Sequence, residues 1–311
     1  MPDVRWGLTL PFAGLPLRDH VDLLRRAEEL GYDDLWTGET AGPDGFTPLA
    51  MAAAVTDRIR LATGIVNPYT RGPALLAQQA AALQDASGGR FVLGIGSSSN
   101  VIVERWNEIP FVKPLSKVRE SVEGLHKVFA GERGAGGFKL ETPPAEPIPI
   151  VIAALRGKML ALAGELGDGA FTNFLPLSGL PQVKQAFGAD DKELACRFFC
   201  VPMPEEQGMG LAKHLFAAYG TVPVYAAFFR WLGWAEQLDP MVEAWQAGDR
   251  KLALELCPED LVREIFVFGG PDEMRERLGR FVDGGITTLI LTPIAAPDQV
   301  PAFMDSLAPT G

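Results

Sequence analysis

Glu39 and Thr40 follow a short strand-like run, residues 32–37, and Asp44 lies close behind them in the chain. A carboxylate at the end of a buried strand can accept a proton or orient a ligand. A glutamate on a solvated loop fits the same spacing equally well. Glu39 is therefore a candidate acid–base group whose surroundings in the fold must decide its role.

Three serines follow another strand-like run, residues 90–96, and their short hydroxyls could contact a ligand: Ser97, Ser98 and Ser99. A nucleophilic serine needs a neighbouring base, usually a histidine. The histidines all fall in helix-like segments far apart in the sequence, at His20, His126 and His214. We therefore exclude a serine hydrolase and expect no metal site.

Arg156-Gly157-Lys158 opens a predicted helix that runs to Leu166. Backbone N–H groups at a helix start bind phosphate or carboxylate, and the two flanking cations add charge. The alternative is a glycine turn with two solvated cations. The motif alone does not separate an anion site from such a turn.

Thr63-Gly64-Ile65 lies at the end of a third strand-like run, residues 59–66. A glycine beside a β-branched residue permits a bulge or a close approach of the backbone to a ring-shaped ligand. An ordinary strand glycine is the alternative. Gly64 therefore becomes informative only together with its neighbours.

Residues 58–100 predict the unit that positions these groups. Residues 59–66 are β-rich, residues 73–86 carry apolar side chains at helical spacing, and residues 90–96 are nearly apolar throughout, as in a strand buried on both faces. Such a strand, helix and strand form a right-handed unit with parallel strands. Ligands sit at the C-terminal ends of such strands, where the polar groups lie.

Strand-like and helix-like segments alternate along the whole chain. Eight strand-like runs are visible, at residues 4–11, 32–37, 59–66, 90–96, 148–154, 170–175, 194–201 and 287–292. Residues 204–268 instead predict several helices, and residues 266–270 a short irregular link. We predict an α/β fold, a single (β/α)₈ TIM barrel over residues 1–311 with a helical insertion at 204–268. A doubly wound open sheet is the alternative, but the GxGxxG opening is missing.

Composition limits the partners. The net charge is −11, which argues against nucleic acid and anionic membranes, and 47% of the 311 residues are hydrophobic. We see no apolar stretch of membrane-spanning length. The odd number of cysteines and their spacing predict reduced, buried thiols in a cytoplasmic protein: Cys196, Cys200 and Cys257.

Four segments, residues 38–50, 60–99, 103–115 and 153–176, together resemble the bacterial luciferase-like superfamily, and within it the branch that uses coenzyme F420, a deazaflavin. The strongest motif is TGIVNPYTR followed by SGGRFVLGIG. The resemblance covers about residues 3–188 well and 200–270 poorly. It implies a (β/α)₈ barrel with the cofactor across the C-terminal mouth, and a non-prolyl cis peptide between Gly64 and Ile65 that backs the ring.

The resemblance also implies roles for individual residues. The candidate catalytic residues are Glu39, Thr40 and Asn67, with Asn67 beside the ring and Glu39 near its pyrimidine side. The cofactor tail is expected to lie against Gly96, Ser97 and Ser98. Its phosphate end is expected at Ala154, Leu155, Arg156, Gly157, Lys158 and Asn173.

One departure from the family pattern concerns proton transfer. Several relatives carry a histidine where this chain has Thr40, so a proton would have to come from another group, such as Glu39 or water. The resemblance implies an F420-dependent oxidoreductase that moves a hydride to or from a small organic substrate. The alternatives are an FMN-dependent monooxygenase and a non-catalytic flavin-binding barrel. A homodimer is expected, with the substrate selected by residues 100–114 and 204–268.

Overall fold

Eight parallel strands form a closed barrel in the computed structural model, which describes residues 4–309. Strand β9 pairs with both β1 and β7, and this double pairing closes the ring. The predicted (β/α)₈ barrel is therefore confirmed. The strands of the ring are β1 (Arg5–Leu10), β2 (Asp34–Thr37), β3 (Arg60–Thr63), β4 (Phe91–Ile95), β5 (Ile150–Ala153), β6 (Gly169–Asn173), β7 (Glu193–Val201) and β9 (Thr288–Pro293).

A ninth strand differs from the prediction. The irregular link expected at residues 266–270 contains the two-residue strand β8 (Val267–Phe268). It pairs in parallel with Cys200 and Val201 at the end of β7, beside the ring. The strand predicted at residues 287–292 is consequently the ninth strand in chain order, although it is the eighth of the barrel.

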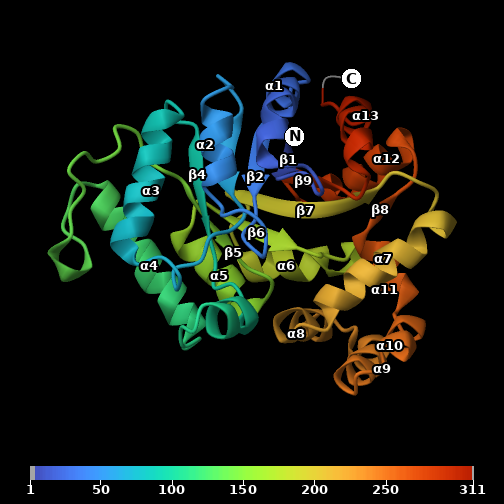
Figure 1. Ribbon diagram of the computed structural model, residues 1–311. Helices are drawn as coiled ribbons and strands as arrows, with labels where there is room; N and C mark the ends of the chain where they lie inside the picture. The colour runs from blue at the N-terminus through green and yellow to red at the C-terminus, as the bar shows by residue number, and fades with distance from the viewer. Residues whose placement is uncertain (1–3, 310–311) are drawn as a thin grey trace.

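Helices surround the ring of strands (Figure 1). In α3, Pro73 occupies the first helical turn, where its missing N–H costs nothing, and Leu76, Ala80 and Leu83 are buried at helical spacing. Gly88, with φ of +65°, follows the end of this helix. The helices outside the insertion are α1 (Val21–Glu29), α2 (Thr47–Ala53), α3 (Pro73–Ala86), α4 (Pro114–Phe129), α5 (Gly157–Leu166), α6 (Leu180–Phe187), α12 (Pro271–Asp283) and α13 (Val300–Ser306).

The predicted helical insertion is observed between β7 and β8. Its helices gather on one side of the barrel, at the lower right of Figure 1. They are α7 (Glu205–Gly220), α8 (Pro223–Trp231), α9 (Ala235–Gln246), α10 (Arg250–Glu255) and α11 (Glu259–Ile265). A short π-helix, Val101–Trp106, was not predicted and lies in the loop after β4. Among residues 4–309, no helix combines the length and the apolar character needed to cross a bilayer.

The interior of the barrel is packed with side chains. One layer forms its middle: Trp36, Ala62, Val92, Val151, Phe171, Ala195 and Ile290. The rings of Trp36 and Phe171 stack with centroids 5.6 Å apart. Because this layer fills the barrel, a ligand must bind above it, at the C-terminal mouth.

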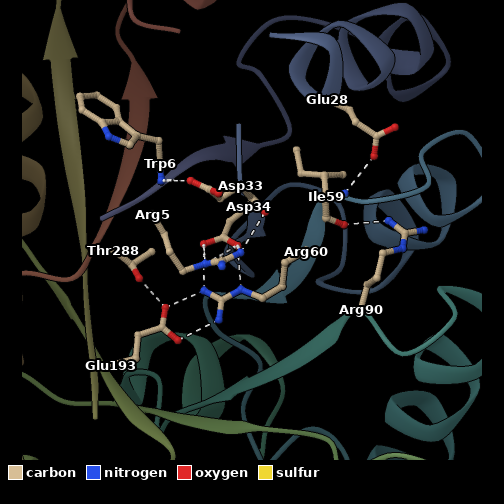
Figure 2. A network of polar contacts seen from close by, with 10 residues as sticks. All are labelled: Arg5, Trp6, Glu28, Asp33, Asp34, Ile59, Arg60, Arg90, Glu193 and Thr288. Atoms are coloured by element: carbon tan, nitrogen blue, oxygen red, sulfur yellow. Dashed lines mark hydrogen bonds and ion pairs between the residues drawn. The ribbon is translucent and has the colours of Figure 1, made fainter. Parts of the chain in front are cut away.

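Charged side chains close the opposite, N-terminal end of the barrel (Figure 2). Arg60 Nε and Nη2 donate to Asp34 at 2.7 and 2.8 Å, and its Nη1 and Nη2 donate to Glu193 at 2.9 and 2.6 Å. Arg5 donates to Asp34 at 2.6 Å, and Thr288 donates to Glu193 at 2.5 Å. Burial alone would raise the pKa of Asp34, but the guanidinium groups of Arg60 and Arg5 lower it below its ordinary value.

The cysteines are free and buried, as predicted. Burial raises the pKa of the Cys196 and Cys200 thiols well above the ordinary range. Burial also raises the pKa of Cys257 to about 12.

Candidate active site

The peptide between Gly64 and Ile65 is cis, as the resemblance implied. It lies directly after β3, and a Cβ on Gly64 would come within 3.0 Å of Trp36 Cε3 and 3.2 Å of Phe171 Cε2. A larger side chain would therefore strike the aromatic layer of the barrel. The backbone at Gly64 therefore packs directly on that layer and forms a floor at the mouth of the barrel.

Two glycines of β4 and its end complete this floor. A Cβ on Gly94 would lie 1.7 Å from the Thr63 carbonyl oxygen, and one on Gly96 would lie 2.7 Å from Ala153 Cβ. Backbone hydrogen bonds from Val66 to Gly94 and from Gly96 to Val66 hold the two strand ends together, at 3.0 and 3.1 Å. The floor is thus smooth because no side chain fits there.

Glu39 and Arg71 form an ion pair at the mouth, between the loops that follow the neighbouring strands β2 and β3. Arg71 Nη1 and Nη2 donate to the two carboxylate oxygens of Glu39 at 2.5 and 2.6 Å, and the side chains are 11% and 16% exposed, Arg71 and Glu39 respectively. The backbone N–H of Gly45 also donates to Glu39, at 3.1 Å, and Arg71 Nε donates to Gln79 at 2.9 Å. This arrangement holds Glu39 as an oriented hydrogen-bond acceptor.

Asn67 is buried beside the floor. Its side-chain oxygen accepts hydrogen bonds from the backbone N–H groups of Tyr69 and Thr70, at 3.1 and 3.0 Å, and from the Thr70 hydroxyl at 3.1 Å. Within the described part of the chain, its Nδ2 has no acceptor. The amide is therefore fixed in orientation with its two donors available to a ligand.

Thr40 and Asp44 have different surroundings. Thr40 is exposed. Asp44 accepts hydrogen bonds from the backbone N–H groups of Phe46 and Thr47 at the start of α2, at 2.8 and 3.0 Å. Burial would raise the pKa of Asp44, but these bonds and that from the Thr47 hydroxyl lower it. Asp44 thus fixes the start of a helix.

The predicted tail and phosphate segments follow β4 and β5. Ser98 has a φ of +61° and Gly157, which opens α5, a φ of +44°. Arg156 and Lys158 are exposed on either side of Gly157, and neither forms an ion pair with another described residue. Three features, the α5 N-terminus and two unpaired cations, fit an anionic group.

The sequence did not single out Arg197 and Tyr225, which the structure brings to Asn173. Arg197 Nε donates to Asn173 Oδ1 at 3.2 Å, and Asn173 Nδ2 donates to the Tyr225 hydroxyl at 2.9 Å. Arg197 is the one cation inside the apolar run LACRFFCV, and that signal could have identified it. Burial raises the pKa of Tyr225, although Arg197 and the bond from Asn173 oppose this.

No group of three or more potential metal ligands occurs among residues 4–309. The mouth instead combines a smooth backbone floor, an oriented amide, a paired carboxylate and separate cations. Such a set suits a flat ring with polar edges and an anionic tail, because the floor supports the ring and the cations neutralise the tail.

Known proteins share this architecture. A supposed coenzyme F420-dependent oxidoreductase of Mycobacterium tuberculosis is 28% identical over an alignment of 334 positions, which covers 93% of this chain and 95% of the relative. The coenzyme F420-dependent tetrahydromethanopterin reductase from Methanopyrus kandleri has a similar structure, with a TM-score of 0.77, 23% identity and coverage of 99% and 98%. The oxygenating constituent of 3,6-diketocamphane monooxygenase from Pseudomonas putida was solved with FMN. It matches with a TM-score of 0.70 and 19% identity, and the match covers 99% of this chain and 98% of that protein.

The match to a protein family also spans most of the chain. Residues 6–288 match the model of the luciferase-like monooxygenases, and they include every residue of the mouth described above. By this match, the chain belongs to the luciferase-like monooxygenase family.

Proposed function

We propose that the protein is an F420-dependent oxidoreductase that transfers a hydride between the deazaflavin and a small organic substrate. The observation that carries this proposal is the floor built by Gly64, Ile65, Gly94 and Gly96 above the packed barrel layer. Names of relatives support the choice of cofactor, since the M. tuberculosis relative and the M. kandleri reductase are both described as F420-dependent.

The residues present fit the cofactor. Its ring would rest on the cis peptide of Gly64 and Ile65, with the Asn67 amide and the Glu39 carboxylate at its polar edges. Its anionic tail would run past Ser97 and Ser98 toward Arg156 and Lys158, the cations on either side of Gly157. These cations belong to residues 154–158, the predicted phosphate segment, which follows β5. When bound, the deazaflavin supplies a carbon that accepts or releases a hydride.

The protein's own part is orientation. Arg71 holds Glu39 in place, and the turn at Tyr69 and Thr70 holds Asn67, so neither side chain must reorganise when the ring binds. Thr40 presents a hydroxyl where the family resemblance implies a histidine in several relatives, so we assign no imidazole-mediated proton transfer to this chain.

FMN is the second candidate cofactor, because the P. putida monooxygenase of the same fold was solved with FMN. A fluorescence titration of the protein with F420, run in parallel with FMN, decides between them. We expect saturable F420 binding at least about tenfold tighter than FMN binding. A preference for FMN would move the function to oxygen activation, and binding of neither would contradict both cofactor assignments.

Matched variants locate the cofactor in the same titration. Lys158→Gln should weaken F420 binding because it removes a cation from the expected phosphate end. Lys127→Gln removes a charge from the last turn of α4 and serves as the control. Equal affinities in both variants would contradict the placement of the tail.

We further propose that the chain is one functional domain that acts as a cytoplasmic homodimer on a small molecule, without nucleic acid or membrane partners. Three large apolar side chains near the mouth are exposed to solvent: Leu75 (48%), Trp106 (55%) and Val112 (62%). They support self-association, because exposed apolar surface of this kind marks protein interfaces. Sedimentation at several concentrations measures the assembly. A monomer at all concentrations would refute the dimer.

A further inference from the structure

Arg197 occupies the inner face of β7 at the mouth. Successive strand residues alternate in direction, and Ala195 two positions earlier belongs to the middle layer of the barrel, so Arg197 lies one layer nearer the mouth. Its Nη1 would be 3.4 Å from a Cβ on Gly38, at the end of β2. The guanidinium group therefore reaches from β7 across the mouth toward the end of β2 and the floor.

Arg197 lacks a counter-charge. No carboxylate of residues 4–309 lies within 4.0 Å of it, and its hydrogen bond to a described residue runs from Nε to the neutral amide of Asn173. By contrast, Arg60 at the N-terminal end of the barrel and Arg71 at the mouth each have a carboxylate partner. A partly buried cation without a partner is costly, and the two Nη groups form a fork that matches a carboxylate.

A cluster of aromatic rings lies beside this cation. Arg197 Cζ lies 5.2 Å from the Phe199 ring centroid, and Phe199 stacks on Phe174 at 4.4 Å. The insertion adds Tyr219 from α7 and Tyr225 from α8, at 4.8 and 5.4 Å from Phe174. The helical insertion thus supplies part of an aromatic wall beside the guanidinium.

We propose that Arg197 binds the carboxylate of an aromatic or bulky apolar monoanionic substrate, whose body lies against Phe199, Tyr219 and Tyr225. A single guanidinium balances one negative charge, which favours a carboxylate over a phosphate dianion. Asn173 positions the guanidinium through its amide oxygen, and its Nδ2 holds the Tyr225 hydroxyl. This inference rests on the proposed function, because it makes this side of the mouth the substrate side. It assigns Asn173 to that side, instead of to the phosphate end of the cofactor that the family resemblance implied.

Benzoate and benzamide are matched probes, since they differ mainly in charge. Isothermal titration calorimetry should show benzoate binding to the wild-type protein, and Arg197→Gln should raise its Kd roughly tenfold or more, as expected for a lost charged hydrogen bond. Arg197→Lys should fall between the two, because it keeps the charge but loses the fork. The exposed Arg58, beyond the N-terminal end of β3, provides the control: Arg58→Gln changes the net charge equally and should bind as the wild type does.

The same variants are titrated with F420 to separate this inference from the proposed function. We expect Arg197→Gln to bind F420 within about twofold of wild type. Benzoate binding that depends on Arg197 in a protein that ignores F420 would refute the F420 function alone. No benzoate binding to wild type, equal binding to Arg197→Gln, or loss of F420 binding in Arg197→Gln would overturn the substrate assignment. Should Arg197→Gln not fold, Arg197→Lys and Tyr225→Phe provide the same comparison.

Discussion

Arg71 and Glu39 form a two-point ion pair at the barrel mouth, joining the loop after β3 to the loop after the adjacent strand β2. Both side chains are largely buried, so the pair is shielded from solvent and its members depend on each other. Arg71 also lies with its Cζ 5.3 Å from the centroid of the Phe46 ring, at the start of α2. One guanidinium thus fixes the carboxylate that is expected to meet the cofactor.

The first prediction tests this pair with a double-mutant cycle. Arg71→Met leaves Glu39 without its partner, and Glu39→Gln leaves Arg71 without its partner, so each single variant should lose stability. The double variant should lose less than the sum, with a coupling of about 0.5–3 kcal/mol in the free energy of unfolding. Urea denaturation measures it. Additive losses would show that the two residues act independently.

The second prediction concerns the floor. Gly64→Ala places a methyl group 3.0 Å from Trp36 in a close-packed layer, so we expect a loss of about 1–3 kcal/mol in stability and weaker F420 binding. Gly72→Ala is the control, because a Cβ there meets nothing within 4 Å. Thermal unfolding and the F420 titration report both effects. Unchanged F420 affinity in a folded Gly64→Ala protein would show that the floor is not part of the F420 site.

The third prediction is that stability depends on pH through Asp34, in the charged cluster at the N-terminal end of the barrel. The folded pKa of Asp34 lies below its unfolded value of about 3.9, so its stabilisation is present above that pH and is lost as the pH falls through the folded pKa. Asp34→Asn should lose about 3–5 kcal/mol at pH 7, since it removes a buried partner of Arg60.

The measurement is urea unfolding at intervals from pH 7 down to pH 3. The difference between wild type and Asp34→Asn should shrink toward the acid end. Glu165→Gln, at an exposed pair with Arg119, should track the wild type throughout. If the stability difference between the two proteins stayed constant with pH, the pKa of Asp34 would be the same in the folded and unfolded states, which would contradict this prediction.

The fourth prediction concerns the thiols. Burial raises the pKa of all three cysteines, so little reactive thiolate should form at pH 8. A colorimetric thiol reagent should react slowly with the native protein and with three thiols after denaturation, the number in the sequence. Rapid reaction of one native thiol would show that its surroundings open in solution.

Much of the barrel could be predicted because its signals are local and repeated. A strand buried on both faces, such as residues 91–95, is apolar throughout, and Gly88 and Gly89 mark the end of the helix before it. Strand β8 escaped prediction because two residues, Val267 and Phe268, carry no periodicity. The π-helix at Val101–Trp106 depends on hydrogen bonding that residue types do not specify.

The site could be predicted only in part. Gly64, Asn67 and Glu39 stand in a recognisable motif, and the structure brings Glu39 and Asn67 to the same mouth as Gly64. Arg71, the partner of Glu39, lies 32 positions away, and the two meet because the neighbouring strands β2 and β3 bring the loops after them together. Arg197 and Tyr225 meet through Asn173 across 24 and 52 positions, and a single sequence does not reveal such contacts.

Closure through β9 also affects synthesis of the chain. Until Thr288–Pro293 has been made, β1 and β7 each keep an unpaired edge. Helix α13 is tied to α1 by the ion pair of Arg26 with Asp305, and to the segment after α1 by the Tyr32 hydroxyl, which donates to the Met304 carbonyl at 2.9 Å. A growing polypeptide thus carries two exposed strand edges until β9 has been synthesised, and chaperone protection matters most during that interval.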